Sequence, residues 1–167
     1  MATTVRIPMA ILTVQPDSGN CFYETKTGTN VDYSYFGYVD AGVGSSTWWG
    51  LVPSNVAATE AWNIELYHHN NGGTNGNVVI DVLAIAGSHS RPIDLAMTRI
   101  SSAAVIAANS SSLRLFSAVT GATLDAVIAL SSNNYLMVQV DRFGNHTSDS
   151  ISAQWNLESV ILRIDVA

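Results

Sequence analysis

The chain has 167 residues, a mass of 17.8 kDa and a formal net charge of −6, which suits a single globular domain with a sizeable core. Its seven Lys and Arg residues lie scattered, which excludes nucleic-acid binding through a basic patch, and its one cysteine, Cys21, excludes an intrachain disulfide. Charged residues make up only 12%, about half of the usual share. A surface with so few charges is typical of a protein that is packed against other molecules or lies outside cells. An ordinary neutral β-protein fits the composition equally well.

The N-terminal segment is apolar and extended. Residues 5–14 carry the run around Pro8 and are followed by turn-forming residues at 16–20. The run is too short to span a membrane, and the segment lacks the long apolar core of a signal peptide. We therefore predict an extended N-terminal arm over residues 1–14 and a single domain over residues 15–167.

The rest of the chain reads as short strands separated by turn residues. The runs with a strand pattern are 21–24, 33–38, 47–52, 61–69, 77–86, 112–119, 122–130, 135–142 and 159–167. Residues 93–108 also fit a helical spacing, but their β-branched residues favour a strand. Leu136, Val138 and Val140 alternate as in a half-buried strand. The pattern predicts an all-β protein, an antiparallel β-sandwich of the jelly-roll type with eight to ten strands.

Few residues indicate chemistry. His68 and His69 are adjacent at the end of a predicted strand, so their side chains point to opposite faces and do not chelate one ion together. No nucleophile motif or phosphate-binding loop occurs in its required context. The acids near strand ends have arginines close by and are expected to form structural ion pairs; they are Asp81, Asp141 and Asp165, with Arg99, Arg142 and Arg163. We therefore expect no catalytic residue, no cofactor, no metal site and no enzymatic activity, and we expect the polar loop 143–149 to be a surface connection.

Aromatic residues cluster in two predicted strands. They are Tyr33, Tyr35, Tyr38, Trp48 and Trp49. Exposed Trp and Tyr side chains on a β-surface can hold sugar rings through their apolar faces. Residues of this kind are more often part of a core or an interface, so both alternatives stay open.

The order of strands resembles a known group of viral proteins. The segments that carry the resemblance are 33–40, 49–53, 61–67, 77–82, 135–142 and 160–166. They resemble the small jelly-roll structural proteins of tailed bacteriophages, of the kind found as capsid cement (decoration) proteins and in fibre or tail modules. The resemblance implies a homotrimer that binds the major capsid protein on the outside of the virion capsid, after synthesis in the host cytoplasm, and stabilises the shell.

This resemblance leads to specific expectations about partners. Besides its own copies and the major capsid protein, we expect neither nucleic acid nor a membrane as a partner. Partner contacts are expected from the apolar arm and from the tryptophan pair, at Ile7, Met9, Ile11, Leu12, Trp48 and Trp49. The alternatives are a phage fibre or tail module and a carbohydrate-binding β-sandwich.

Overall fold

The structure is a computed structural model that describes residues 3–14, 20–27, 32–56, 62–72, 75–87, 96–108, 115–119 and 135–166. These residues form eleven strands: β1 Thr3–Pro8, β2 Ala10–Val14, β3 Cys21–Thr27, β4 Asp32–Tyr38, β5 Val43–Leu51, β6 Trp62–Asn70, β7 Gly76–Gly87, β8 Thr98–Ala108, β9 Leu115–Val119, β10 Tyr135–Phe143 and β11 Trp155–Val166. Within the same residues, no helix is long and apolar enough to cross a membrane. The predicted all-β fold is confirmed.

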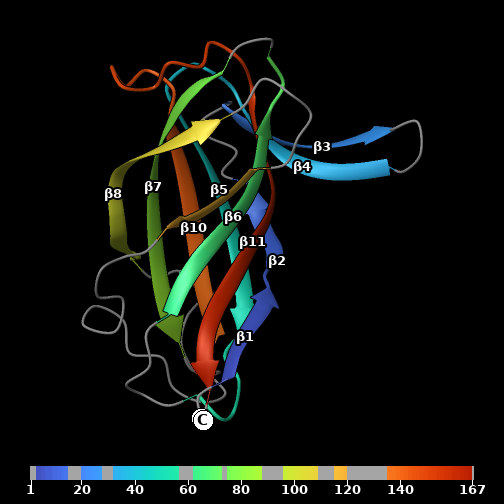
Figure 1. The fold of residues 1–167 in the computed structure, drawn as a ribbon, viewed down its shortest axis with the longest axis vertical. Coiled ribbons are helices and arrows are strands. Elements are labelled where there is room, and N and C mark those ends of the chain that lie inside the picture. Colours follow the sequence, from blue (N-terminus) through green and yellow to red (C-terminus); the bar gives the residue numbers. More distant parts are fainter. Residues whose placement is uncertain are drawn as a thin grey trace.

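The strands build two antiparallel sheets that face each other as a sandwich (Figure 1). The six-stranded sheet has the order β3-β4-β11-β6-β9, with β1 also pairing with β11. The five-stranded sheet has the order β2-β5-β10-β7-β8. Most neighbours in space are not neighbours in sequence, as in a jelly roll. The predicted antiparallel sandwich is therefore confirmed, with more strands than the eight to ten expected, because residues 3–14 contribute two of them.

The N-terminal segment joins both sheets. Strand β1 pairs with β11, starting at Thr3 opposite Val166, and β2 pairs with β5. Between them, the Met9 backbone N–H donates to the Val160 carbonyl at 2.9 Å, and the Met9 side chain is buried. Residues 3–14 are extended, as expected for an arm, but they pair within the sandwich instead of reaching beyond it. The backbone N–H and C=O groups of this segment form hydrogen bonds with strands of the same chain, so they need no partner from another molecule.

The core lies between the sheets and follows the period-2 pattern of the strands. Leu136, Val138 and Val140 of β10 point inward and are fully buried, as the alternation predicts. Trp62 and Trp155 fill the space on the six-stranded side. Burying apolar surface of this size stabilises the fold by about 25 cal/mol per Å², so the aromatic residues contribute a large share of the stability.

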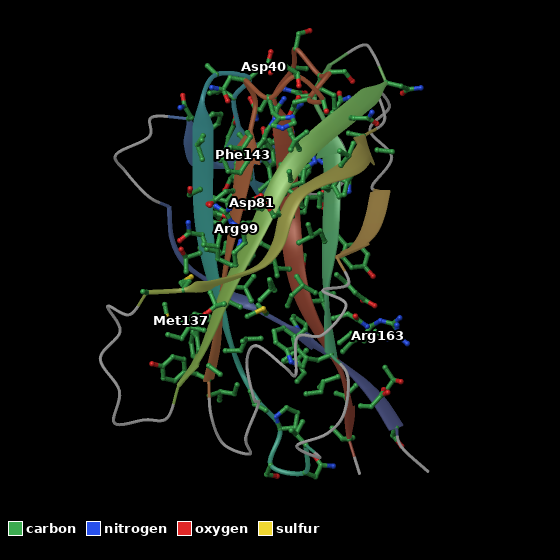
Figure 2. The ribbon with its side chains drawn as sticks, turned by 90° about the vertical axis from the view of Figure 1, so that its left-hand side faces the viewer. Asp40, Asp81, Arg99, Met137, Phe143 and Arg163 are labelled. Atoms are coloured by element: carbon green, nitrogen blue, oxygen red, sulfur yellow. The ribbon has the colours of Figure 1, made fainter. Side chains whose placement is uncertain are left out.

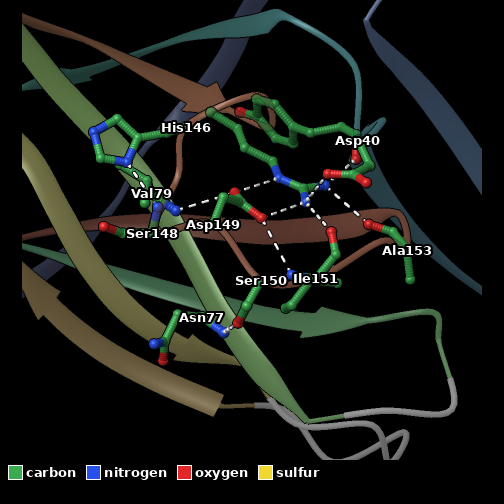
Figure 3. Close-up of polar contacts among 11 residues, drawn as sticks. Asp40, Asn77, Val79, His146, Ser148, Asp149, Ser150, Ile151 and Ala153 are labelled. Carbon is green, nitrogen blue, oxygen red and sulfur yellow. Dashed lines mark hydrogen bonds and ion pairs between the residues drawn. The ribbon is translucent and has the colours of Figure 1, made fainter.

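One buried arginine lies at the end of this core. Arg142, on β10, points inward and is completely buried. Its Nε and Nη2 atoms donate to the two oxygens of Asp149, at 3.1 and 2.9 Å, and Nη2 also lies 3.2 Å from Oδ1 of Asp40 (Figure 3). The side chain of Asp149 is equally buried. This is a two-pronged ion pair removed from water, a geometry in which a guanidinium suits a carboxylate especially well.

The remaining donors of Arg142 hold backbone carbonyls. Nη1 donates to the carbonyls of Tyr38, at 3.0 Å, and Ala153, at 2.9 Å, and Nη2 donates to that of Ile151, at 2.8 Å (Figure 3). Arg142 thus links β10 of one sheet to the end of β4 in the other and to the loop that precedes β11. The polar loop that begins at residue 143 is a surface connection at its tip, and its Asp149 end is anchored inside the protein.

We expect Arg142→Met to destabilise the protein by about 3–5 kcal/mol, because it leaves the buried Asp149 carboxylate without its cationic partner, with only the backbone N–H groups of Val79 and Ile151 as donors. Chemical denaturation of the wild type and the variant at pH 7 measures this difference. The double variant Arg142→Met with Asp149→Leu removes both charges and should recover much of the loss. A loss below about 1 kcal/mol for the single variant would contradict the role assigned to the pair.

A second buried polar contact joins β6 to β11. The indole Nε1 of Trp155 donates to Nδ1 of His68 at 3.0 Å, and neither residue is exposed. An imidazole that accepts at Nδ1 is neutral. Burial lowers the pKa of His68 from 6.5 to about 4, the neighbouring His69 acts in the same direction, and Glu158 acts against them.

This contact makes stability dependent on pH. Between pH 6.5 and about 4, the unfolded chain protonates His68 while the folded chain does not, so stability falls as the pH is lowered through that window. The total loss from this group is about 3 kcal/mol. His68→Gln keeps an acceptor for Trp155 but has no imidazole to protonate. From pH 7 to pH 4, the free energy of unfolding of this variant should therefore fall less than that of the wild type. Equal slopes for both proteins would refute this assignment.

Candidate functional site

The outer surface of the five-stranded sheet holds the candidate site. Strand β10 runs between β5 and β7, and its residues Met137, Gln139 and Asp141 point away from the core. Their register partners are Trp49, Thr47 and Ser45 on β5, and Ile85, Leu83 and Asp81 on β7. We call these residues the outer-face cluster. Figure 2 shows Asp81 and Met137, together with Arg99 of β8, on this side of the molecule, and Arg163 of β11 on the other.

The outer-face cluster changes from apolar to polar along the strands. At one end lies the Trp49 side chain, which is 38% exposed, with Met137 beside it in register. At the other end Asp141 and Asp81 face each other across β10 and β7, and they are only 8% and 3% exposed. Four residues along a strand separate the two ends, which is about 13 Å. The cluster is thus longer than a single sugar ring.

Asp81 is held by two strong contacts from β8. Arg99 Nε lies 2.8 Å from Oδ2, and the backbone N–H of Ala103 donates to Oδ1 at 2.6 Å. The Arg99 side chain remains 55% exposed, so its guanidinium is anchored at one edge and faces the surface with the rest. The structural ion pair predicted between these residue types is confirmed for Arg99 and Asp81.

The backbone of β8 is distorted where it meets Asp81. Ala103 has a φ of 47°, in the left-handed region that a residue with a Cβ seldom adopts. The register between β7 and β8 shifts on either side of Val82, which marks bulges. Strained residues persist where surrounding contacts hold them, and they often cluster at functional sites. The bond from Ala103 to Asp81 is the contact that holds this one.

Asp141 sits in a less favourable environment. Burial raises the pKa of its carboxyl, and the charge of Asp81 acts in the same direction. Hydrogen bonds from Ser45 and Gln139 and the charge of Arg99 act against that rise; the Gln139 amide donates to Oδ1 at 2.8 Å. The cluster therefore contains a strong acceptor, an amide and an indole on one surface, with the guanidinium of Arg99 beside it on β8.

The structure separates the residues predicted to contact partners. Met9 and Trp48 are buried in the core, where the Trp48 indole donates to Ser46 Oγ at 2.8 Å. Ile7 is half-buried and packs against the core. These three residues are therefore not available as an exposed contact surface for a partner. The pairing of residues 3–14 with β11 and β5 turns alternate side chains of this segment toward the core.

Two of the predicted contact residues lie on the surface. Ile11 and Trp49 are exposed, and for them the partner role stays a prediction. The side chain of Leu12 lies outside the described residues. Of the tyrosines considered for sugar binding, Tyr35 and Tyr38 are buried and Tyr33 is half-buried.

The histidines also differ from expectation in part. His68 and His69 point to opposite faces of β6, as predicted, but both are buried. His68 belongs to the core, and Nδ1 of His69 lies 2.9 Å from Oε1 of Glu158 on the outer side of the six-stranded sheet. No group of three or more His, Cys, Asp and Glu side chains in the described part of the chain could hold a metal ion.

Sequence reasoning missed the site itself. It treated Asp81, Asp141 and Arg99 as structural ion-pair residues and did not consider Gln139. Their grouping follows from β5, β10 and β7 lying side by side, which their distance in sequence conceals. One available signal was the alternation in β10, which places Met137, Gln139 and Asp141 together on the outward face.

Comparisons with known proteins address the fold. No protein-family model and no curated protein matches the chain. Among solved structures it is similar to the isomalto-dextranase of Arthrobacter globiformis T6 complexed with panose, with a TM-score of 0.54 and 15% identity over 95% of this chain and 23% of that chain. The chain thus spans less than a quarter of that enzyme's length.

Two separate carbohydrate-binding modules are also similar. The C-terminal family 6 module of the marine laminarinase LamC from Zobellia galactanivorans has a TM-score of 0.46 and 12% identity, over 96% of this chain and 98% of that chain. The family 11 module from Clostridium thermocellum has a TM-score of 0.43 and 10% identity, over 93% and 95%. At such identities a likeness concerns the fold alone.

The environment of Asp141 leads to a test. Because the pKa of Asp141 is raised, this residue contributes stability that is fully present below its ordinary pKa of 3.8. That contribution is lost as the pH rises through the raised pKa. Asp141→Asn stays neutral, so its free energy of unfolding should rise relative to that of the wild type between pH 3.5 and pH 7. Urea denaturation at both pH values measures this, and a relative fall would contradict it.

Proposed function

We propose that this chain is a carbohydrate-binding β-sandwich that holds a sugar chain along the outer-face cluster. The observation that carries the proposal is the exposed ring of Trp49 on the same surface as Asp141, Gln139 and Arg99. An indole face covers the apolar face of a pyranose, while carboxylate, amide and guanidinium groups exchange hydrogen bonds with its hydroxyls.

The dimensions of the surface support an oligosaccharide as ligand. Trp49 and Asp141 lie at opposite ends of a stretch of about 13 Å, so one ring can stack on Trp49 while the next units reach the polar end. Gln139, half-buried, lies between them. The sheet and their mutual contacts already hold the polar side chains in place. Less side-chain entropy is therefore lost when a ligand binds.

Asp141 fits this role for an energetic reason. Its carboxylate is kept in a place that raises its pKa through burial. A sugar hydroxyl that donates to it would replace part of the lost hydration. Proteins often keep a locally unfavourable group where it is needed for binding.

The capsid-cement role implied by the phage resemblance remains a separate proposal. Exposed apolar side chains on the same sheet favour it, namely Ile11 of β2 and Trp49 and Leu51 of β5. Contact with other copies of the chain, or with a capsid protein, would remove this surface from water. The two proposals predict different outcomes for one substitution.

We expect Trp49→Ala to weaken polysaccharide binding at least tenfold, since stacking on an aromatic ring and the burial that accompanies it contribute about 1–2 kcal/mol. Binding is measured by affinity electrophoresis and calorimetry. The ligands tested are panose, α-glucans, β-glucans, xylan and galactan. Trp49 is partly exposed, so the variant should remain folded.

The matched control is Tyr23→Ala, which removes an exposed aromatic residue from β3 in the other sheet and should leave binding unchanged. Failure of the wild type to bind any polysaccharide of this range would overturn the proposal. Light scattering of the same proteins distinguishes the rival: a wild-type trimer that Trp49→Ala dissociates would favour the assembly role.

A further inference from the structure

The outer surface of the six-stranded sheet has an open cavity of about 350 Å³. It lies on the face of the sandwich opposite to the outer-face cluster. Its lining residues come from β4, β6 and β11 and are Tyr33, Ser34, Tyr67, Glu158, Ser159 and Ile161. The volume is at the lower end of the range for small-molecule sites. The sugar-binding proposal does not use this cavity.

The cavity follows from the way β4 leaves the sheet. Only Phe36–Tyr38 of β4 pair with β11, and the earlier residues of the strand pair with β3 alone. In Figure 1 the β3–β4 hairpin projects sideways from the sandwich. Tyr33 and Ser34 therefore stand off from β11, which leaves space between them and residues 158–161.

A β-bulge places a carboxylate in this space. The pairing of β11 with β6 shifts register between Leu157 and Ser159, so Glu158 is the extra residue. A bulge re-aims the side chain that it carries. The Glu158 side chain is only 11% exposed, yet it lines the cavity.

A chain of polar contacts fixes the orientation of Glu158. The Gln154 amide donates to Asn156 Oδ1 at 2.7 Å, and Asn156 Nδ2 lies 2.9 Å from Nε2 of His69. Nδ1 of the same ring lies 2.9 Å from Oε1 of Glu158, a close contact that lacks the alignment of a hydrogen bond. The Glu158 carboxylate is thus placed directly beside the His69 ring.

Aromatic rings form the walls beside this carboxylate. Tyr33 and Tyr67 line the cavity, and the Tyr33 ring lies 6.2 Å from the His69 ring, edge to face, and 5.9 Å from the Tyr35 ring. Tyr35 is itself fixed, since its hydroxyl donates to Glu24 Oε2 at 2.8 Å. Ring faces attract cations, and more strongly when water is partly excluded.

The carboxylate that lines the cavity favours a cation. The protein carries a net charge of −6. Glu158 belongs to the lining, while Lys26, the register partner of Tyr33 on β3, is exposed, and Arg6 is bound to Glu65 at 3.0 Å. A ligand group with a positive charge would meet a carboxylate, two tyrosine rings and serine hydroxyls.

We propose that this cavity, built by the Glu158 bulge and the tyrosines of β4 and β6, binds an alkylammonium group. The primary ammonium can come from a lysine side chain or from an amino sugar, and both present the same chemistry. A neutral sugar carries no charge that the Glu158 carboxylate could attract.

Titrations followed by NMR test the inference. The charged probes are Nα-acetyl-lysine methylamide and glucosamine, and their neutral counterparts are Nα,Nε-diacetyl-lysine methylamide and N-acetylglucosamine. At least one charged probe should shift the resonances of Tyr33, Tyr67 and Glu158, and the neutral ones should not. A preference for one charged probe identifies the source of the ammonium.

Glu158→Gln keeps an acceptor for His69 and should lower the affinity for the charged probe at least about tenfold, as expected for loss of a charge-assisted contact. The matched control is Asp165→Asn, the same change of charge on the same strand but outside the cavity, and it should leave affinity within about twofold. Tyr67→Phe should retain binding, and Tyr67→Leu should lose it, because the ring is needed and its hydroxyl is not.

The same titrations in the Trp49→Ala background separate this site from the proposed sugar site, because binding in the cavity should be unaffected there. Equal response to charged and neutral probes would overturn the inference, as would affinity unchanged by Glu158→Gln. Shifts confined to the outer-face cluster would overturn it as well.

Discussion

The buried guanidinium of Arg142 is the constraint on which the rest of the arrangement depends. It extends inward from β10 and binds Asp149, Asp40 and the carbonyl of Tyr38, so it joins the two sheets and the loop before β11 at one point. A charge in this position is tolerated because each of its donors has a partner. Its inward orientation fixes the alternation of β10, and with it the outward direction of Asp141 next to it.

The fold could be predicted from the sequence because its main signal is local. Alternation of side chains, as in Leu136, Val138 and Val140, identifies a half-buried strand without knowledge of its neighbours. The order of strands could not be predicted in the same way, since β10 pairs with β5 and β7, far away in sequence. The fate of residues 3–14 depended on the same long-range pairing, and an apolar extended segment looks alike as an arm and as two strands.

The candidate site was harder to predict than the fold for a related reason. Adjacent residues of a strand point to opposite faces, so one of Trp48 and Trp49 had to be in the core, but the pattern alone does not tell which. Charged partners are likewise chosen in three dimensions. Asp81 pairs with Arg99 as expected, whereas Arg142 binds acids from two loops. Asp141 was therefore predicted to be neutralised by an arginine, and instead it accepts hydrogen bonds from an amide and a hydroxyl.

The pairing of β1 with β11 has a consequence for the order of folding. Thr3 lies opposite Val166, so β1 meets its partner strand only after all the strands between them have been made. Contacts this distant in sequence are slow to form. Until β11 is present, the backbone groups of β1 that it pairs with are open, and an open strand edge can pair with other chains.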